Sequence, residues 1–325
     1  YPRMARASGS NGLGRRRSDI RPSPRRAARS RVAREARRGA RPSTAGDVAA
    51  AAQLACILEA TAAKPGNVAP GDGNAFHDTR YEDFLASAAA IGPAFLQAGR
   101  RPLGILIRDA TAATTRWTRA NTNLGIILLL APLARAARDP RPGSLRDRVR
   151  RVLGHTTVHD AAHVYAAIRL TNPGGLGRVD DQDVANTPTR TLRDVMTLAA
   201  DRDGVAREYA TGYRVTFDVG APALRRARRD GLSWDDAIVE TYLTLLSTSH
   251  DTLIARKLGT AVATDVSRRS RAVLEAGGVR TAPGRRRIAA FDCALRDAHN
   301  ARNPGSPADL TTAAIYAVLL EGGWS

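Results

Sequence analysis

The stretch DVAAAAQLACILEAT, residues 47–61, shows the helical spacing of apolar side chains that recurs along the rest of the chain. Its bulkier side chains recur every three or four residues, the spacing of one helical face. They belong to Val48, Leu54, Ile57, Leu58 and Thr61. Asp47 is of a type favoured at a helix N-cap. Pro65 ends the pattern, because the residue before a proline is displaced from helical backbone angles. The stretch therefore predicts a helix capped by Asp47.

Helical spacing continues along most of the remaining chain, and no long run alternates with the period of a β-strand. Turns rich in Gly and Pro separate the helical stretches. We expect helices over residues 80–98, 103–119, 122–138, 143–153, 156–170, 188–219, 233–249, 252–277, 284–299 and 308–322. The chain is thus predicted to be all-α, with residues 47–325 forming a single multi-helix globular bundle.

Residues 1–46 differ in composition from the rest. They contain 14 Arg against Asp19 and Glu35, a net charge of +12, within a chain of 325 residues whose formal net charge is +19. They lack apolar periodicity, so we expect a disordered basic tail. A solvated tail, a transit-type peptide and a non-specific nucleic-acid arm all agree with this composition. The overall charge therefore says little about the chemistry of the body.

Composition excludes several protein classes. The longest apolar run, from Leu124 to Ala136, contains Gly125 and Pro132 and is shorter than the roughly 20 residues of a membrane span. The two cysteines form no CxxC pair, which excludes a disulfide framework and a zinc-finger pattern. We expect a cytoplasmic protein that does not span a membrane, and a homo-oligomer is compatible with the sequence.

Only two of the 50 basic residues are Lys, at positions 64 and 257. A Lys that persists in so Arg-rich a chain indicates a need for the compact ammonium group, which Arg does not reproduce. Lys64 follows Glu59 and precedes Pro65 and Gly66. An ammonium group beside a glycine, whose backbone a ligand can approach closely, suits phosphate. The alternative is that Lys64 only neutralises the negative end of a helix.

Further polar clusters lie at predicted helix starts. Asp78 and Glu82 are four residues apart, and paired carboxylates there could hold Mg²⁺ beside a triphosphate. Acidic residues also simply favour a helix N-terminus. Asn121 and Asn123 precede the most apolar helix, where amides cap the helix or recognise a base or ribose. Asp251 can cap the helix that carries the second Lys.

A stripe of histidines has a structural interpretation. His155, His159 and His163 are spaced four residues apart, which would place them on one helix face. The first and last would lie about 12 Å apart along the axis, too far to share one ion. We therefore interpret the stripe as a margin of the core.

In this order, the clusters resemble the triphosphoribosyl-dephospho-CoA synthase family over residues 48–322. The resemblance rests on Glu59 with Lys64-Pro65-Gly66, Asp78 with Glu82-Asp83-Phe84, Asn121-Thr122-x-x-Gly125, Asp251-Thr252, and Pro304-Gly305 with Ala308-Asp309-Leu310. The family is all-helical and moves the 5-triphosphoribosyl group of ATP to the 2′-hydroxyl of 3′-dephospho-CoA, releasing adenine. The family motif NTHKG is replaced here by NTNLG at residues 121–125, so the chain resembles a divergent branch whose acceptor can differ.

The resemblance implies an ATP-binding transferase of cofactor biosynthesis that uses Mg²⁺ and takes dephospho-CoA or a related acceptor. The nucleotide and phosphate contacts expected from it are Lys64, Gly66, Asn121, Asn123, Arg256 and Lys257. The expected Mg²⁺ ligands are Asp78, Glu82 and Asp251, and Asp78 or Asp251 is the expected general base. Glu59, Asp83 and Asp309 are expected to support the site.

Two other functions agree with the sequence. An ATP-using ligase or kinase in pterin or furan one-carbon cofactor biosynthesis would yield ADP or AMP instead of adenine. A non-enzymatic, basic nucleic-acid-binding protein would retain nucleic acid on the body after removal of the tail. We expect nucleic acid to bind only non-specifically, through the tail.

Overall fold

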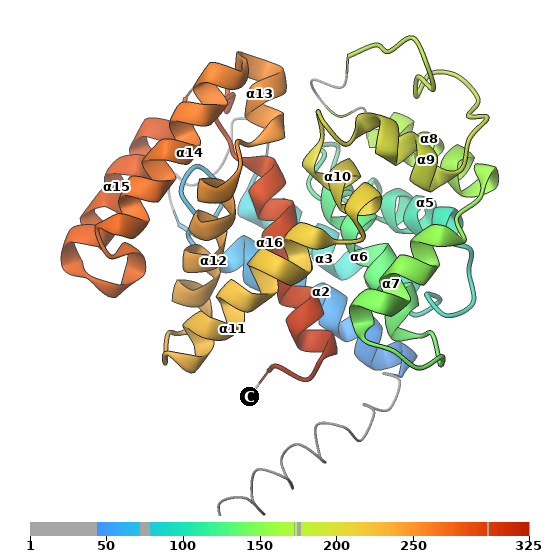
Figure 1. Ribbon diagram of the computed structural model, residues 1–325, viewed down its shortest axis with the longest axis horizontal. Helices are drawn as coiled ribbons and strands as arrows, with labels where there is room; N and C mark the ends of the chain where they lie inside the picture. The colour runs from blue at the N-terminus through green and yellow to red at the C-terminus, as the bar shows by residue number, and fades with distance from the viewer. Residues whose placement is uncertain (1–43, 72–78, 172, 174–176, 298, 325) are drawn as a thin grey trace, which may run out of the picture. The chain divides into compact units, whose positions relative to one another are not determined.

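The computed structural model describes residues 44–71, 79–171, 173, 177–297 and 299–324. All regular secondary structure within these residues is helical, which confirms the all-α prediction (Figure 1). The helices are, in chain order, α2 (Ala45–Thr61), α3 (Tyr81–Ala90), α4 (Gly92–Phe95), α5 (Leu103–Thr114), α6 (Leu124–Ala137), α7 (Leu145–Gly154), α8 (Val158–Thr171), α9 (Leu192–Ala199), α10 (Gly204–Thr211), the π-helix η1 (Thr216–Gly220), α11 (Ala221–Arg229), α12 (Trp234–Thr248), α13 (Thr252–Leu258), α14 (Thr260–Glu275), the 3-10 helix η2 (Gly278–Arg280), α15 (Ala282–Leu295) and α16 (Gly305–Leu320).

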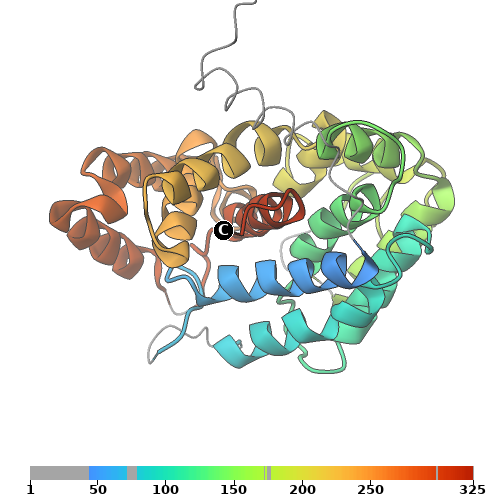
Figure 2. The same ribbon diagram turned by 90° about the horizontal axis from the view of Figure 1, so that it is seen from below.

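Helix α16 lies in the middle of the bundle (Figures 1 and 2). It packs against α2, α6, α12 and η1, and most of its side chains are buried. The buried Tyr316 hydroxyl donates a hydrogen bond to the Val48 carbonyl of α2 at 3.0 Å. Because α16 is enclosed on several sides, the residues at its N-terminal end are held in fixed positions.

Helix α6 is buried along nearly all its length although it contains Pro132. Proline has no N–H, so the Leu128 carbonyl one turn earlier loses its helical partner. The Tyr209 hydroxyl donates to that carbonyl at 2.7 Å, and the Tyr213 hydroxyl donates to the Leu129 carbonyl at 2.7 Å. Both tyrosines are fully buried. These two hydrogen bonds attach the α10 region to α6 at the proline.

The predicted cap of the first helix is wrong by three residues. The N-cap is Thr44, whose Oγ1 accepts a hydrogen bond from the Asp47 backbone N–H at 3.1 Å. The Asp47 carboxylate in return accepts from the Thr44 N–H at 2.9 Å. This reciprocal pair is a capping box, in which the acidic residue occupies the third helical position rather than the cap. The helix therefore begins at Ala45.

Two long predicted helices are interrupted. The stretch 188–219 divides because Asp203 caps α10 and because Gly212 ends it with a left-handed φ of 66°. The stretch 252–277 divides at Gly259, where φ is 87°. Helix α11, which the sequence analysis missed, buries only a narrow strip of small side chains and Leu224. The predicted histidine stripe is also wrong, because His155 caps the C-terminus of α7 and lies outside α8.

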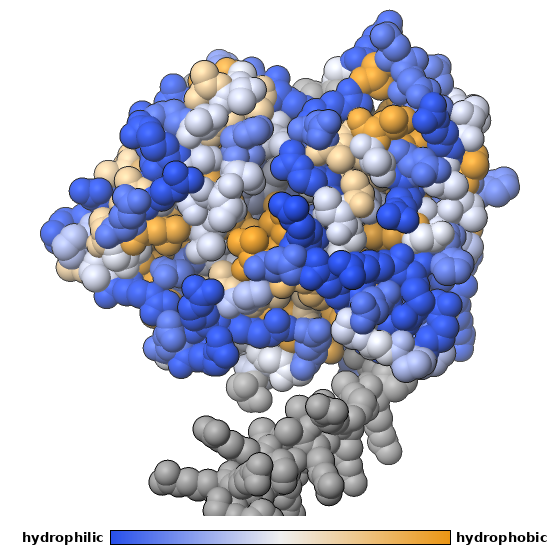
Figure 3. All heavy atoms as spheres, viewed as in Figure 1, coloured by the Kyte–Doolittle hydropathy of each residue, from blue (hydrophilic) through white to orange (hydrophobic). Residues whose placement is uncertain are grey.

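The arginines of the body lie largely on exposed helix faces. Figure 3 shows hydrophilic side chains gathered over α7 and α11, each of which carries four arginines and buries its apolar face. Within the described residues, every helix is too short or too polar to cross a bilayer.

Candidate functional site

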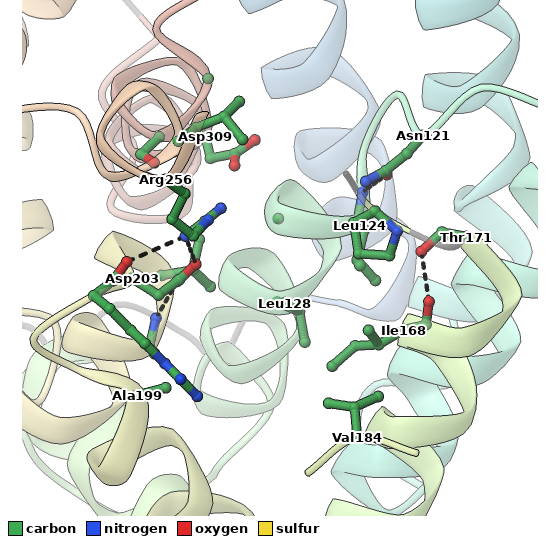
Figure 4. Close-up of a pocket in the computed structure, with 18 of the residues that line it drawn as sticks. Asn121, Leu124, Leu128, Ile168, Thr171, Val184, Ala199, Asp203, Arg256 and Asp309 are labelled. Atoms are coloured by element: carbon green, nitrogen blue, oxygen red, sulfur yellow. Dashed lines mark hydrogen bonds and ion pairs between the residues drawn. The ribbon is translucent and has the colours of Figure 1, made fainter. Parts of the chain in front are cut away.

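A pocket of about 570 Å³ lies between helices that are distant in sequence (Figure 4). Its lining comes from helices α6, α8, α9, α10 and α13, from the start of α16 and from residues 299–303. Figure 4 shows Asp203, Arg256 and Asp309 together on one side, facing Ile168 and Val184 across the pocket. This volume is typical of pockets that bind small molecules or cofactors.

One end of the pocket is polar and cationic. Figure 4 draws Asp203, Arg256 and Asp309 there, and their chain neighbours Arg202, Lys257 and Ser306 also line the pocket. Asn121 lies on the facing side, beside Leu124 and Thr171. Arg119, His299, Asn300 and Asn303 complete the polar lining. Among the described residues there, Arg202, Arg256 and Lys257 outnumber the carboxyl groups of Asp203 and Asp309, so the positive charge exceeds the negative. Such an end favours an anionic ligand group, and arginine in particular suits the oxygens of phosphate.

The other end of the pocket is apolar. Figure 4 draws Leu124, Leu128, Ile168 and Val184 there, and Val164, Leu192, Val195 and Met196 are further apolar lining residues. Asn121 and Thr171 lie at the margin of this side, whereas Ala199 lies beside Asp203. Leu128 and Met196 are buried, whereas Ile168 and Val184 are half-buried at the pocket wall. A flat, weakly polar ligand group such as a nucleobase can bury its faces against such a wall.

Three helix N-termini meet beside the polar end. Thr252, at the start of α13, accepts a hydrogen bond through Oγ1 from the Gly204 N–H of α10 at 3.0 Å. The same hydroxyl lies 2.8 Å from the Ser306 hydroxyl of α16. These contacts set the relative positions of the helices that carry Asp203, Arg256 and Asp309.

Asp251 reinforces this junction. Its Oδ1 accepts from the Ile254 N–H at 2.5 Å and its Oδ2 from the Ser306 N–H at 2.9 Å. The residue is only 1% exposed, and burial raises the pKa of its carboxyl group to about 6 despite these hydrogen bonds. Asp251 thus joins α13 to α16 from behind the pocket surface.

Arg256 is oriented by acceptors that belong to the start of α10. Its Nη1 donates to Asp203 Oδ2 at 2.7 Å and to the Arg202 carbonyl at 3.2 Å. Asp203 in turn caps α10, because its Oδ1 accepts from the Ala206 N–H at 2.9 Å. The guanidinium group is therefore positioned at the pocket before any ligand arrives.

Asp309 projects from the second turn of α16 against α6. A Cβ atom at Gly125 would overlap its carboxylate, so only glycine permits this close approach. Among the described residues, the Asp309 carboxylate has neither a hydrogen-bond donor nor an ion-pair partner. Burial raises the pKa of the Asp309 carboxyl group well above the usual range, and the nearby carboxylates of Glu59, Asp203 and Asp251 act in the same direction with smaller effect.

Comparison with known proteins identifies the family. The model of the ATP:dephospho-CoA triphosphoribosyl transferase family matches residues 45–325. The chain belongs to this family of transferases. A Stutzerimonas stutzeri (strain A1501) relative named as a 2-(5''-triphosphoribosyl)-3'-dephosphocoenzyme-A synthase is 30% identical over 291 residues, covering 85% of this chain and 92% of the relative. A relative of the same name from Pseudomonas aeruginosa (strain UCBPP-PA14) is 31% identical over 232 residues, 70% of each chain.

A solved structure agrees with this assignment. The crystal structure titled as a triphosphoribosyl-dephospho-CoA synthase from Archaeoglobus fulgidus is 30% identical, with a TM-score of 0.59. The similarity covers 75% of this chain and 99% of that one. Membership of this transferase family favours the predicted transferase over the ligase, kinase and nucleic-acid-binding alternatives.

The pocket of this family member brings together several residues that the sequence analysis selected. Asn121, Arg256, Lys257 and Asp309 all line it. The Asn121 side chain also contacts the start of α6, because its Oδ1 accepts from the Leu124 N–H at 3.2 Å. The predicted nucleotide contacts of Asn121, Arg256 and Lys257 and the predicted supporting role of Asp309 stay predictions, but these four residues share one cavity.

The first predicted cluster lies outside the pocket lining. Lys64 is 1% exposed, and its Nζ lies 3.1 Å from Glu59 Oε1 and donates to the carbonyls of Glu59 and Ala62. The Gly66 N–H donates to Asp292 Oδ1 at 2.7 Å. Both groups predicted to contact phosphate already have protein partners, and their role with phosphate stays a prediction.

The remaining predicted residues are distributed around the pocket. Asn123 is buried and donates to Thr114 Oγ1 at 3.2 Å. Asp83 accepts from the Arg80 N–H at 2.8 Å at the start of α3, and Glu82 is exposed there. Asp78 lies outside the described residues, although the adjacent Thr79 lines the pocket. Within the described part of the chain, no three His, Cys, Asp or Glu side chains are grouped to hold a metal.

Sequence reasoning missed Asp203, Arg119, Arg202 and most of the apolar wall. Asp203 was hidden inside a stretch predicted as one continuous helix. The pair Asp203-Gly204 has an N-cap residue type at its first position, and that signal could have revealed the break. The apolar wall carries no comparable signal, because its side chains follow the same helical spacing as the core.

Proposed function

We propose that the pocket binds ATP and catalyses transfer of its 5-triphosphoribosyl group to a hydroxyl of dephospho-CoA or a related acceptor, with release of adenine. The observation that carries the proposal is the continuity of a cationic end and an apolar end within one cavity. ATP has the same division, with a triphosphate at one end and adenine at the other. Family membership supports the reaction class.

Different lining residues bind different parts of the ATP molecule. Arg119, Arg202, Arg256 and Lys257 neutralise the triphosphate, and Asn121 hydrogen-bonds to the ribose or base. The apolar wall that includes Ile168 and Val184 receives adenine. Cleavage of the bond between C1′ and adenine passes through an oxocarbenium-like state, as in glycoside cleavage. Holding the acceptor hydroxyl against C1′ therefore supplies much of the rate enhancement.

Mg²⁺ enters, in our proposal, bound to the phosphate oxygens of the ATP substrate. Such an ion needs only one or two protein carboxylates, because Mg²⁺ retains several waters. Asp251 does not suit this task, since both of its oxygens accept backbone hydrogen bonds. Asp78 and Glu82 stay the predicted ligands.

We also propose that the enzyme works in the cytoplasm. Both cysteines are free thiols, which is typical of a reducing compartment. A homo-oligomer remains compatible with this proposal.

Calorimetric titration tests the division of the pocket. ATP and adenosine should both bind, and ATP should bind more tightly. Lys257→Met should weaken ATP about tenfold, the effect of one lost charge–phosphate contact, and leave adenosine unchanged. Arg268→Met, which removes an exposed cation outside the pocket, is the matched control. Equal weakening of both ligands by Lys257→Met would contradict the proposed orientation.

A further inference from the structure

We propose that the Asp309 carboxylate is the group that takes the proton from the acceptor hydroxyl during transfer. This inference rests on the proposed function. The carboxylate lies against Gly125 of α6, in the same helix as the apolar-wall residues Leu124 and Leu128. It also shares the polar end with Arg256. Asp309 therefore marks the boundary between the two ends of the pocket.

This boundary is where the reacting atom of ATP must lie. With the triphosphate at the cationic end and adenine at the apolar end, the ribose lies between them. C1′ then faces the boundary at which Asp309 meets Gly125. A general base must come within hydrogen-bond reach of the hydroxyl that attacks, so its position at this boundary is the first requirement.

Two other described carboxylates near the polar end, those of Asp203 and Asp251, already have partners. Asp203 accepts from the Ala206 N–H and from Arg256, and Asp251 accepts from two backbone N–H groups. Asp309 has no such partner among the described residues. Its oxygens are therefore open to a hydroxyl group of a ligand.

The proposed step conserves atoms and protons. The acceptor oxygen forms a bond to C1′ while the C1′–N9 bond of ATP breaks, and the bonding electrons leave with adenine. The hydroxyl proton passes to an Asp309 carboxylate oxygen and later to solvent. Adenine takes one proton from water, so the reaction has no net change in protonation.

Burial favours this role because a carboxylate with a raised pKa is a stronger base. Arg119, Arg202, Lys257 and His299 line the same pocket as Asp309. The titratable and charged groups that act on its carboxyl group are Cys56 and Glu59 on α2, Asp203 before α10, and Asp251 and Arg256 at α13. Three of these are carboxyl groups, and Arg256 opposes their effect. The ionised form of Asp309 is the active one, so kcat should rise as the pH passes upward through its pKa.

The experiment compares wild type with Asp309→Asn, which preserves shape and removes the basic group. Adenine release at saturating ATP and dephospho-CoA should fall by about 10²–10⁴-fold, the usual contribution of a general base. The ATP dissociation constant should change by less than about threefold, because the loss belongs to the transition state. The rise of kcat with pH should disappear as well. Asp265→Asn, at a half-buried, ion-paired carboxylate on α14 outside the pocket lining, is the matched control.

Each outcome decides between the two proposals. If wild type releases no adenine with any acceptor, the proposed function fails. If wild type is active and Asp309→Asn keeps kcat within about threefold, Asp309 is not the base and the proposed function stands. If Asp309→Asn loses ATP binding together with activity, or keeps the wild-type pH profile, its role is structural and the inference is overturned.

Discussion

Asp251 and Ser306 are 55 residues apart in the chain, yet Asp251 Oδ2 accepts a hydrogen bond from the Ser306 backbone N–H at 2.9 Å. The bond joins the start of α13 to the start of α16. Arg256 and Lys257 come from the first of these helices, and Asp309 from the second. The polar end of the pocket therefore depends on a junction that lies outside the pocket itself.

Thr252→Val should weaken this junction. Valine has nearly the same shape but leaves the buried Gly204 N–H without its acceptor and removes the contact with the Ser306 hydroxyl. The free energy of unfolding should fall by about 1–3 kcal/mol, the cost of an unsatisfied buried donor. Urea unfolding measures it, with the exposed Thr260→Val as control. Equal stability of both variants would contradict the account of the junction.

Asp251 should make stability depend on pH in a defined direction. Its carboxyl pKa is about 6 in the folded protein, against 3.8 for the free group. The folded state therefore binds the proton of Asp251 more tightly than the unfolded state does. The resulting stabilisation of the folded state is present below pH 4 and is lost as the pH rises to about 6. It amounts to on the order of 3 kcal/mol.

Asp251→Asn should remove that pH dependence. The measurement is the free energy of unfolding of wild type and variant between pH 4 and 7. Groups other than Asp251 titrate in both proteins, so their effects cancel in the difference between the two free energies of unfolding. That difference should therefore change across this pH range because of Asp251 alone. A constant difference would show that Asp251 does not change its protonation there.

The buried pair of Glu59 and Lys64 should contribute to stability as a unit. Lys64→Met alone leaves the Glu59 carboxylate buried without its cation and should cost about 3–5 kcal/mol. The double variant Glu59→Gln with Lys64→Met should recover most of this loss. Its ATP affinity should equal that of wild type if Lys64 is structural. A folded double variant with weakened ATP binding would instead support the predicted phosphate contact.

Gly125→Ala tests the close approach of α6 and Asp309. Alanine favours a helix by up to about 1 kcal/mol over glycine, so the helix itself should form. The new methyl group would overlap the Asp309 carboxylate and displace it. Adenine release should fall at least about tenfold, equivalent to 1.4 kcal/mol in the barrier. Gly154→Ala, where a Cβ meets open space, should keep wild-type activity.

Helical spacing was sufficient to predict the fold class and most helices, because amphipathic stripes and Gly-Pro turns are local signals. The break before Gly204 and the cap at Thr44 were missed, because caps depend on which polar side chain closes the hydrogen bond. Asp203 and Asp47 are the same residue type, yet only the first is an N-cap.

The site was predictable only in part. Asn121, Arg256, Lys257 and Asp309 were found as short polar clusters, and they meet in one pocket. Lys64 has the same sequence signal, but its burial against Glu59 arises from tertiary packing. The apolar wall could not be found, because sequence alone does not show which side of a buried helix faces a cavity.

The most direct test of the central claim is the product formed from ATP. The purified enzyme is incubated with Mg²⁺, ATP and dephospho-CoA, and the bases and nucleotides are separated by HPLC. The account predicts adenine in equal amount to a new acceptor product that carries the triphosphoribosyl group. ADP or AMP in place of adenine, or unchanged ATP with every CoA-type acceptor, would contradict it.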